Sequence, residues 1–447
     1  DLQDPLKPNL EGATRVLVDR FEADYDVLDV VGSRLFLITD KDAPRKRVVA
    51  IDVDEKGPGV LTEVIPERSD LLESCTLADG ALLVSYLADA KAELKVFALD
   101  GKPAEDIPLP ALGTVPEISA APDRTELFYS FTSFLYPATV YRYDLATRQN
   151  EVFRKPQTDF RPEDYEARQL FYHSKDGTRV PMFVVHRKGL ELDGNNPVYL
   201  TAYGGFNVPL TPKFSPAWLA WVEKGGVFAM PNLRGGGEYG REWHLAGTKE
   251  RKQNVFDDFF AAAENLAAKR FTSPRRIAVR GASNGGLLIG AALTQRPDLF
   301  GAAVPQVGVM DMLRYHKFTI GWAWEPDYGL SEQPDAFAYL FKYSPLQNIK
   351  PGTCYPPTLI TTADHDDRVV PGHSFKFAAT MQAAQGCPDP VLIRIDTHAG
   401  HGSGKPLSKV IDEETDILAF MWNHVAPGKK VSEYRGNGEG RGVAASE

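Results

Sequence analysis

The stretch IAVRGASNGGLLIGAAL, residues 277–293, contains a serine between two apolar runs. Ile277–Val279 has the composition of a short buried strand, and Leu287–Leu293 resembles the start of a helix. Between them, Gly281-Ala282-Ser283-Asn284-Gly285 matches the pattern G-x-S-x-G. Glycines beside a serine allow a tight strand-to-helix turn, on which the hydroxyl projects clear of the sheet and meets a helix N-terminus that favours negative charge. We therefore predict that Ser283 is a nucleophile.

A nucleophilic serine needs a base, and the base needs an acid that orients it. In the α/β-hydrolase fold the chain order is serine, acid and then histidine, with loops at the carboxyl ends of strands carrying them. Here the apolar runs Thr358–Thr362 and Val391–Ile395 each lead into a polar loop. These loops contain the candidates Asp364, Asp366, Asp367, His398 and His401. The pattern alone does not choose among them, although the glycines on both sides of His401 suit a mobile catalytic loop.

Attack by a serine creates a negatively charged oxygen that needs hydrogen-bond donors. One donor should be the backbone N–H of Asn284, the residue after the predicted nucleophile. The second should come from the loop after an early strand, which here is Ala202-Tyr203-Gly204-Gly205-Phe206. The glycines let the backbone approach closely, and Tyr203 can donate its hydroxyl.

Residues from Asn196 onward alternate between apolar runs and helical segments. The clearest helix is Val255–Lys269, with Val255, Phe259, Ala262 and Leu266 on one face. Near-continuous apolar strands between helices are typical of a mostly parallel sheet that is covered on both faces. We predict strands at 198–202, 227–230, 277–279, 302–304, 358–362 and 391–395. Residues 156–427 are therefore predicted to form an α/β-hydrolase catalytic domain.

The first part of the chain contains short apolar segments separated by Gly, Asp, Asn and Pro, without helical patterns. We predict strands at 34–39, 48–52, 81–86, 94–98, 126–130 and 139–143. Such spacing favours propeller blades of roughly 40–50 residues, so residues 1–155 would hold about three blades, fewer than the roughly four to eight that close a propeller. We predict a partial β-propeller at 1–155 and, from its Gly, Glu and Arg content, a disordered tail at 428–447.

The composition excludes several function classes. A formal net charge of −10 without a basic stripe argues against nucleic-acid binding. No apolar run approaches the roughly 18 residues of a membrane span, so no membrane partner is expected. Cys75, Cys354 and Cys387 are far apart in the sequence, and we predict inert thiols, no disulfide and a cytoplasmic location. No group of His and Cys has the spacing of a zinc site, so no metal is predicted.

A second glycine motif, Gly235-Gly236-Gly237-Glu238-Tyr239-Gly240, matches the dinucleotide pattern G-x-G-x-x-G. It follows the predicted strand at 227–230, but a dinucleotide fingerprint should open directly into a packed helix. The clear helix starts later, at Val255. We therefore predict a flexible glycine-rich loop beside the active site and no cofactor.

Longer motifs make the chain resemble the prolyl oligopeptidase family, in its prolyl endopeptidase branch. They include Tyr203–Asn207, Arg234–Gly240, Gly281–Leu288, Gln295–Phe300, Val307–Met312, Gly321–Trp324, Asp327–Gly329, Ala363–Val370 and Ala399–Gly402. Looser matches occur in the β-rich part, at Thr39–Pro44 and Phe131–Leu135. The resemblance implies a propeller of seven blades capping an α/β-hydrolase domain. It also implies that residue 1 falls within the propeller, so we expect this chain to lack an N-terminal part.

The resemblance assigns the open positions residue by residue. It implies Ser283 as nucleophile, Asp366 as acid and His401 as base, with oxyanion donors from Tyr203 and the Asn284 backbone. The ring of a substrate proline would stack on Trp324, in a pocket shared with Phe206, Val309, Tyr328 and Val369, and Arg368 would hold a substrate carbonyl. Such a pocket suits proline, which is rigid and lacks an N–H.

The function that this resemblance implies is cleavage of short peptides on the carboxyl side of proline, through an acyl-enzyme. A monomer acting on short proline-containing peptides is expected. One alternative is an oligopeptidase that cleaves after basic residues, which would need carboxylates in its pocket. More distant alternatives are an esterase or lipase, an inactive fragment, or a propeller that only binds other molecules.

Overall fold

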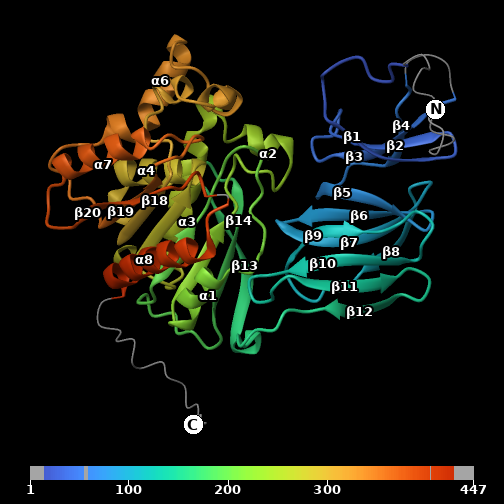
Figure 1. The fold of residues 1–447 in the computed structure, drawn as a ribbon, viewed down its shortest axis with the longest axis horizontal. Coiled ribbons are helices and arrows are strands. Elements are labelled where there is room, and N and C mark those ends of the chain that lie inside the picture. The colour runs from blue at the N-terminus through green and yellow to red at the C-terminus, as the bar shows by residue number, and fades with distance from the viewer. Residues whose placement is uncertain (1–14, 55–58, 403, 427–447) are drawn as a thin grey trace, which may run out of the picture.

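The computed structural model describes residues 15–54, 59–402 and 404–426 (Figure 1). Within these ranges, three four-stranded antiparallel sheets precede an eight-stranded sheet with helices on both faces. The three small sheets lie side by side on one side of the molecule, and the large sheet with its helices forms the other side (Figure 1). The predicted tail at 428–447 lies outside the described residues.

The three small sheets are consecutive blades. The first contains β1 (Tyr25–Val31), β2 (Arg34–Thr39), β3 (Arg47–Asp52) and β4 (Thr62–Ile65), and the second contains β5 (Leu71–Ala78), β6 (Ala81–Ala88), β7 (Lys91–Ala98) and β8 (Pro103–Ile107). The third contains β9 (Thr114–Ser119), β10 (Glu126–Thr132), β11 (Thr139–Asp144) and β12 (Gln149–Arg154). All six predicted strands are correct, and they are the two central strands of each blade.

The large sheet has the order β13-β14-β16-β15-β17-β18-β19-β20. Its strands are β13 (Tyr165–His173), β14 (Arg179–Arg187), β15 (Val198–Thr201), β16 (Val227–Pro231), β17 (Ile277–Ala282), β18 (Ala302–Gln306), β19 (Thr358–Ala363) and β20 (Val391–Asp396). The strands from β16 to β20 are parallel, as predicted. The β13–β14 hairpin, which the sequence patterns did not reveal, adds an antiparallel edge through β14 and β16.

Helices cover both faces of the large sheet because its strands are apolar on both faces. In β15, Val198 and Leu200 pack with α3 (Gln253–Ala268), α4 (Asn284–Gln295) and α7 (Gly372–Ala384). Tyr199 points to the opposite face, where α1 (Pro216–Glu223) and α8 (Leu407–Val425) pack. Successive strand residues point to opposite faces, so this alternation is what a sheet between two helical layers requires.

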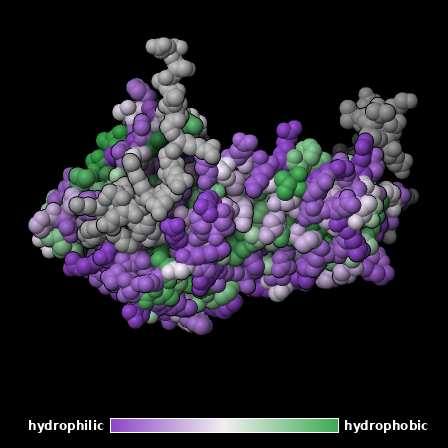
Figure 2. Space-filling model, turned by 90° about the horizontal axis from the view of Figure 1, so that it is seen from below, coloured by the Kyte–Doolittle hydropathy of each residue, from purple (hydrophilic) through white to green (hydrophobic). Residues whose placement is uncertain are grey.

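Shorter helices lie in the connections. They are α2 (Arg241–Leu245), α5 (Glu325–Tyr328), α6 (Pro334–Tyr343), and the 3₁₀ helices η1 (Pro162–Asp164), η2 (Lys249–Arg251), η3 (Pro274–Arg276), η4 (Pro297–Leu299), η5 (Tyr315–Lys317), η6 (Gly321–Trp324) and η7 (Leu346–Asn348). No helix among the described residues is long and apolar enough to cross a membrane. The face in Figure 2 is mostly hydrophilic, with scattered apolar patches.

The strand order creates a switch point at β15. This strand lies between β16 and β17, so the chain leaves β15 in one direction along the sheet and later continues in the other. In open α/β sheets the loops at such a point diverge and leave a crevice at the carboxyl ends of the strands. The loops after β15 and β17 contain Tyr203 and Ser283, which the sheet therefore brings together.

The blades contact the part of the chain that forms the eight-stranded sheet through apolar and polar groups. Phe134, between β10 and β11, lies 5.4 Å from Phe183 and 5.8 Å from Phe228 between ring centroids. The Tyr239 hydroxyl donates to Asp89 Oδ1 at 2.6 Å. Tyr239 belongs to the glycine-rich loop, so this loop is part of the contact with the blades.

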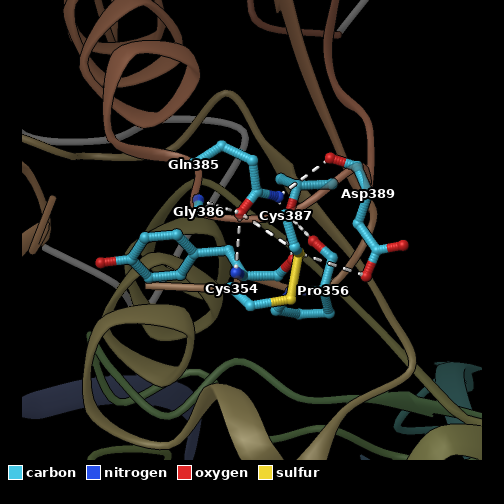
Figure 3. Close-up of a disulfide and its surroundings, with 8 residues drawn as sticks. Cys354, Pro356, Gln385, Gly386, Cys387 and Asp389 are labelled. Carbon is cyan, nitrogen blue, oxygen red and sulfur yellow. Dashed lines mark hydrogen bonds between the residues drawn. A yellow bond between two sulfur atoms is a disulfide. The ribbon is translucent and has the colours of Figure 1, made fainter. Parts of the chain in front are cut away.

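The prediction for the cysteines was wrong in part, because Cys354 and Cys387 form a disulfide (Figure 3). Cys354 precedes β19 and Cys387 precedes β20. These strands are parallel neighbours, so the loops before them meet at one edge of the sheet, although 33 positions separate the two cysteines. Cys75 is unpaired, and burial raises the pKa of its thiol to about 12. The cytoplasmic location was predicted from cysteines that were expected to be unpaired. Because two of them form a disulfide, that argument no longer holds.

Candidate active site

Ser283 lies on the turn between β17 and α4 with φ 60° and ψ −118°. A residue with a side chain rarely adopts positive φ, so the surrounding structure holds this serine in a strained conformation. A Cβ on Gly281 would lie 2.3 Å from the Gly285 carbonyl oxygen, and one on Gly285 would lie 2.9 Å from the Ala202 oxygen. The two glycines of the motif are therefore required by close backbone packing. Asn284 is the first residue of α4, where a backbone N–H has no acceptor within the helix.

The loop after β15 lies against this turn. Gly204 has φ +64°, and a Cβ on Gly205 would lie 2.6 Å from Nδ2 of the Asn284 side chain. The Asn284 side chain donates from Nδ2 to the Tyr203 carbonyl oxygen at 2.6 Å. Burial raises the pKa of the Tyr203 phenol, and the interaction of its hydroxyl with Ser283 acts in the opposite direction. Tyr203 therefore keeps its proton at neutral pH and remains a donor.

His401 and Asp366 form a hydrogen-bonded pair, with 2.7 Å between His401 Nδ1 and Asp366 Oδ2. The other carboxylate oxygen, Oδ1, accepts from the backbone N–H groups of Arg368 at 3.0 Å and Val369 at 2.8 Å. Asp366 is 2% exposed, so water does not compete for these bonds. This arrangement fixes the carboxylate and directs one oxygen to the imidazole, which leaves Nε2 as the ring nitrogen available for proton transfer.

The other candidates in these loops make different contacts. Asp364 Oδ1 is 2.7 Å from His365 Nδ1 and also accepts from the Ala399 N–H at 3.3 Å. The hydrogen bond with His365 lowers the pKa of Asp364 to about 2. His398 has φ 54° and stacks on the exposed His365, with 6.0 Å between ring centroids. Of these candidates, the pair Asp366 and His401 is the one that combines a buried carboxylate with a half-buried imidazole.

A cavity of about 330 Å³ brings most of the predicted site residues together. Its lining consists of Tyr203, Phe206, Ser283, Asn284, Val309, Ile320, Trp324, Tyr328 and Arg368. Val369 does not line it: this residue is 1% exposed and belongs to the core behind the cavity. Ile320 was not predicted. It precedes η6, and its own sequence context carries no signal that would have pointed to a pocket.

Aromatic rings form the apolar wall of this cavity. Trp324 stacks on the buried Tyr315 with 6.2 Å between centroids and 12° between planes. Phe206 meets Tyr328 edge to face at 5.4 Å. The guanidinium of Arg368 is exposed and forms no ion pair with any residue in the described part of the chain. An arginine without a protein partner at a pocket wall is free to bind a carbonyl or carboxylate of a ligand.

Ser283, Asp366 and His401 follow the parallel strands β17, β19 and β20, so all three lie at the carboxyl ends of the large sheet. Arg368 lines the cavity beside Ser283 and also donates its N–H to Asp366, which links the pair to the cavity wall. Among residues 15–54, 59–402 and 404–426, no hydrogen bond joins the Ser283 hydroxyl to His401. Catalytic hydrogen bonds of this kind are often long in ligand-free enzymes and tighten when substrate binds.

A polar network behind the cavity contains residues that the sequence patterns did not identify. Asp327 is 4% exposed and accepts from the Phe206 N–H at 2.8 Å, and His244 Nε2 lies 2.9 Å from its other oxygen. Burial alone would raise the pKa of Asp327, but His244 and the charge of Lys252 outweigh burial and lower it. Lys252 is fully buried here as well. The Asp327-Tyr328-Gly329 motif was the available signal for Asp327, whereas Lys252 had none.

One group among the described residues has the geometry to hold a metal ion: Cys354, Cys387 and Asp389. In the structure the two sulfur atoms are bonded to each other (Figure 3), so neither is a thiolate ligand.

The glycine-rich loop serves close packing: a Cβ on Gly235 would lie 2.7 Å from the Gly204 oxygen, and one on Gly240 would lie 2.4 Å from the Pro44 oxygen.

A strained serine turn on an α/β sheet, an Asp–His pair and an aromatic cavity are features of an α/β-hydrolase, and the three antiparallel sheets before it resemble propeller blades. Two family models match the chain: the prolyl oligopeptidase family at residues 212–428, and its N-terminal β-propeller domain at residues 1–156. The chain belongs to the prolyl oligopeptidase family.

Known relatives are similar over most of this chain. The prolyl endopeptidase of Elizabethkingia meningoseptica is 47% identical over 405 residues, which are 90% of this chain and 57% of that protein. The prolyl endopeptidase of Dictyostelium discoideum is 42% identical, over 91% of this chain and 55% of that protein. A solved structure of prolyl oligopeptidase B from Galerina marginata, bound to a 35mer hydrolysis and macrocyclization substrate, has a TM-score of 0.89 at 36% identity. That match covers 93% of this chain and 60% of the other, so the chain spans less than two thirds of these relatives.

Proposed function

We propose that this chain carries the catalytic machinery of a serine endopeptidase that cleaves short peptides on the carboxyl side of proline. In this proposal His401 takes the proton of Ser283 as the serine attacks the substrate carbonyl. Asp366 holds the imidazole in the required tautomer and stabilises its positive charge. His401 then gives the proton to the leaving amine, and water releases the peptide from the acyl-enzyme in the second half of the reaction.

The observation that carries this proposal is the conjunction of the Asp366–His401 pair with the cavity that contains Ser283. The carboxylate is buried and its remaining oxygen is held by two backbone donors, so it is dedicated to the imidazole. Ser283, on its strained turn, lines the same cavity as Tyr203 and Asn284. These two residues would supply the oxyanion donors, from the phenol and from the backbone N–H.

The cavity wall supports a preference for proline. Trp324, Phe206 and Tyr328 present flat apolar surfaces on which a rigid pyrrolidine ring can stack. Val309 adds an aliphatic surface, and Arg368 would hold a substrate carbonyl with its unpaired guanidinium. The alternative, cleavage after basic residues, would need a carboxylate, and none is among the residues that line this cavity. The names of the relatives, prolyl endopeptidase and prolyl oligopeptidase, agree with this preference.

The first test is Ser283→Ala in the 447-residue chain. The variant should lose labelling by a fluorophosphonate, which reacts with an activated serine, and should lose cleavage of a proline reporter peptide. Its circular dichroism spectrum and melting temperature should match those of the unchanged chain. Labelling that persists in Ser283→Ala would exclude this serine as the nucleophile.

The second test compares two reporter peptides that differ only in the residue before the scissile bond, proline or arginine. The proposal expects cleavage after proline, with the cleaved bond identified by mass spectrometry of the products. Cleavage after arginine instead would support the basic-residue alternative. A simple ester that is hydrolysed while neither peptide is cleaved would indicate an esterase on the same fold.

A further inference from the structure

Lys252, at the start of α3, carries a buried ammonium group beside the proposed oxyanion hole. The residue is 1% exposed. Its Nζ donates to the Gly204 carbonyl oxygen at 2.8 Å and to Asn284 Oδ1 at 3.1 Å. Gly204 follows Tyr203 in the loop after β15, and Asn284 follows Ser283. One side chain therefore joins the two loops that carry the proposed oxyanion donors.

The Asn284 side chain completes this connection. Its Nδ2 donates to the Tyr203 carbonyl oxygen at 2.6 Å, while its Oδ1 accepts from the Tyr328 hydroxyl at 2.8 Å as well as from Lys252. The polar atoms of the Asn284 side chain are thus used to hold the neighbouring loop and helix. The backbone N–H of Asn284 remains as the group available to a substrate oxygen.

The surroundings keep the Lys252 ammonium charged at a free-energy cost. Burial lowers the pKa of Lys252 to about 8, and Asp327 opposes that effect, so the group is charged at neutral pH. The Tyr328 ring lies 5.5 Å from Nζ, within the range of a cation–π interaction. An apolar side chain of similar length would fill this space without removing a charge from water. A costly buried charge beside a reactive serine is typical of a functional requirement.

We propose that Lys252 is a positioning residue of the oxyanion hole, which locks the Gly204 carbonyl to the Asn284 side chain so that the Tyr203 hydroxyl and the Asn284 N–H converge on one point. The inference rests on the proposed function. It goes beyond that function because Lys252 touches neither substrate nor reacting atoms and acts through the two loops. Donors that are displaced by a fraction of an ångström stabilise the developing oxyanion less, while substrate binding in the aromatic cavity is unaffected.

The test replaces Lys252 by methionine, which keeps the length and removes the donors. The matched control is Lys249→Met, an exposed lysine three positions earlier in η2. With a proline reporter peptide, Lys252→Met should lower kcat by about 10–100-fold with KM within about threefold, because a lost oxyanion donor costs roughly 10²–10³-fold and here the donors are only displaced. Lys249→Met should match the unchanged chain. An unaltered kcat in Lys252→Met overturns the proposal.

Binding of two inhibitors separates positioning from a general loss of structure. A peptide aldehyde ending in proline places its hemiacetal oxygen in the oxyanion hole, and its affinity for Lys252→Met should fall by the same factor as kcat/KM. A peptide of the same sequence without the aldehyde should bind both proteins equally. Equal losses of affinity for both peptides would show a merely structural role and overturn the proposal.

Asn284→Ala supplies a second variant, because it removes the clamping side chain and keeps the backbone donor. Its loss of kcat should be at least as large as that of Lys252→Met, because the Asn284 side chain also holds the Tyr203 carbonyl and the Tyr328 hydroxyl. The double variant should be no more than about twofold worse than Asn284→Ala, since both changes break the contact between Lys252 and Asn284. Additive losses overturn the proposal. If circular dichroism shows that Lys252→Met does not fold, Asn284→Ala alone tests the proposal, and an unchanged kcat in that variant overturns it. Failure of the proposed function would instead appear as an unmodified chain that cleaves no proline peptide.

Discussion

At the scale of the residue, Asp366 has two tasks that use different oxygens. Oδ1 accepts the Arg368 and Val369 N–H groups and fixes the loop, while Oδ2 faces His401 Nδ1. Asp366→Asn keeps an oxygen for the backbone but presents an amide N–H to the imidazole, so His401 must protonate Nε2 and can no longer accept the Ser283 proton. We expect kcat for the proline reporter to fall by roughly 10⁴-fold, measured by steady-state kinetics, with the fold retained.

Asp364→Asn is the matched control for this change. It lies two positions earlier in the same loop and also binds an imidazole, His365, on the exposed side of the loop. The substitution keeps an oxygen that can accept the Ala399 N–H, so kcat should stay within about tenfold of the unchanged chain. A larger loss of kcat in Asp364→Asn than in Asp366→Asn would show that Asp364, and not Asp366, is the acid.

At the scale of the element, the Cys354–Cys387 disulfide closes a loop that includes β19, Asp366 and α7. Closing a loop of 33 residues restricts the unfolded chain and should stabilise the fold by about 3–4 kcal/mol. The double variant Cys354→Ser and Cys387→Ser should therefore melt at a lower temperature than the oxidised chain. The measurement is thermal unfolding followed by circular dichroism, with and without dithiothreitol.

Dithiothreitol itself provides the control for this prediction. It should lower the melting temperature of the unchanged chain to that of the double serine variant and should leave the variant unaffected, because Cys75 is unpaired. An equal shift in both proteins would contradict a stabilising disulfide between these residues.

Elements also differ in how readily their sequence reveals them. The central strands of the blades, such as β6, are buried almost throughout and read as continuous apolar runs. The outer strand β12 is exposed at every position and has the composition of a loop. A strand that pairs through its backbone on one side and faces water does not need an apolar pattern, so such strands escape prediction from sequence alone.

At the scale of the whole molecule, the glycine-rich loop holds the blades against the hydrolase domain. The Tyr239 hydroxyl donates to Asp89 in the turn between β6 and β7. Burial is the main cause that raises the pKa of Tyr239, and the interaction with Asp89 raises it further. The hydroxyl therefore remains a donor over the physiological pH range. Tyr239→Phe should lower the free energy of unfolding in urea by about 1 kcal/mol, because it removes the hydrogen bond to Asp89 and leaves that partly exposed carboxylate with Arg179 Nη1 at 3.8 Å. Tyr136→Phe is the control, since that hydroxyl bonds to none of the described residues. Equal losses in both variants would contradict this role.

The sequence by itself determined the fold class, the central strands and the short list of residues able to carry the chemistry. These features depend on apolar periodicity and on local turns, such as the glycines around Ser283, which neighbouring residues encode directly. The family resemblance already pointed to Asp366 and His401, whereas the Cys354–Cys387 pair and the position of Lys252 between Gly204 and Asn284 were decided only by the tertiary structure. Each joins segments far apart in the chain, and such contacts arise from strand order and packing, which local pattern does not specify.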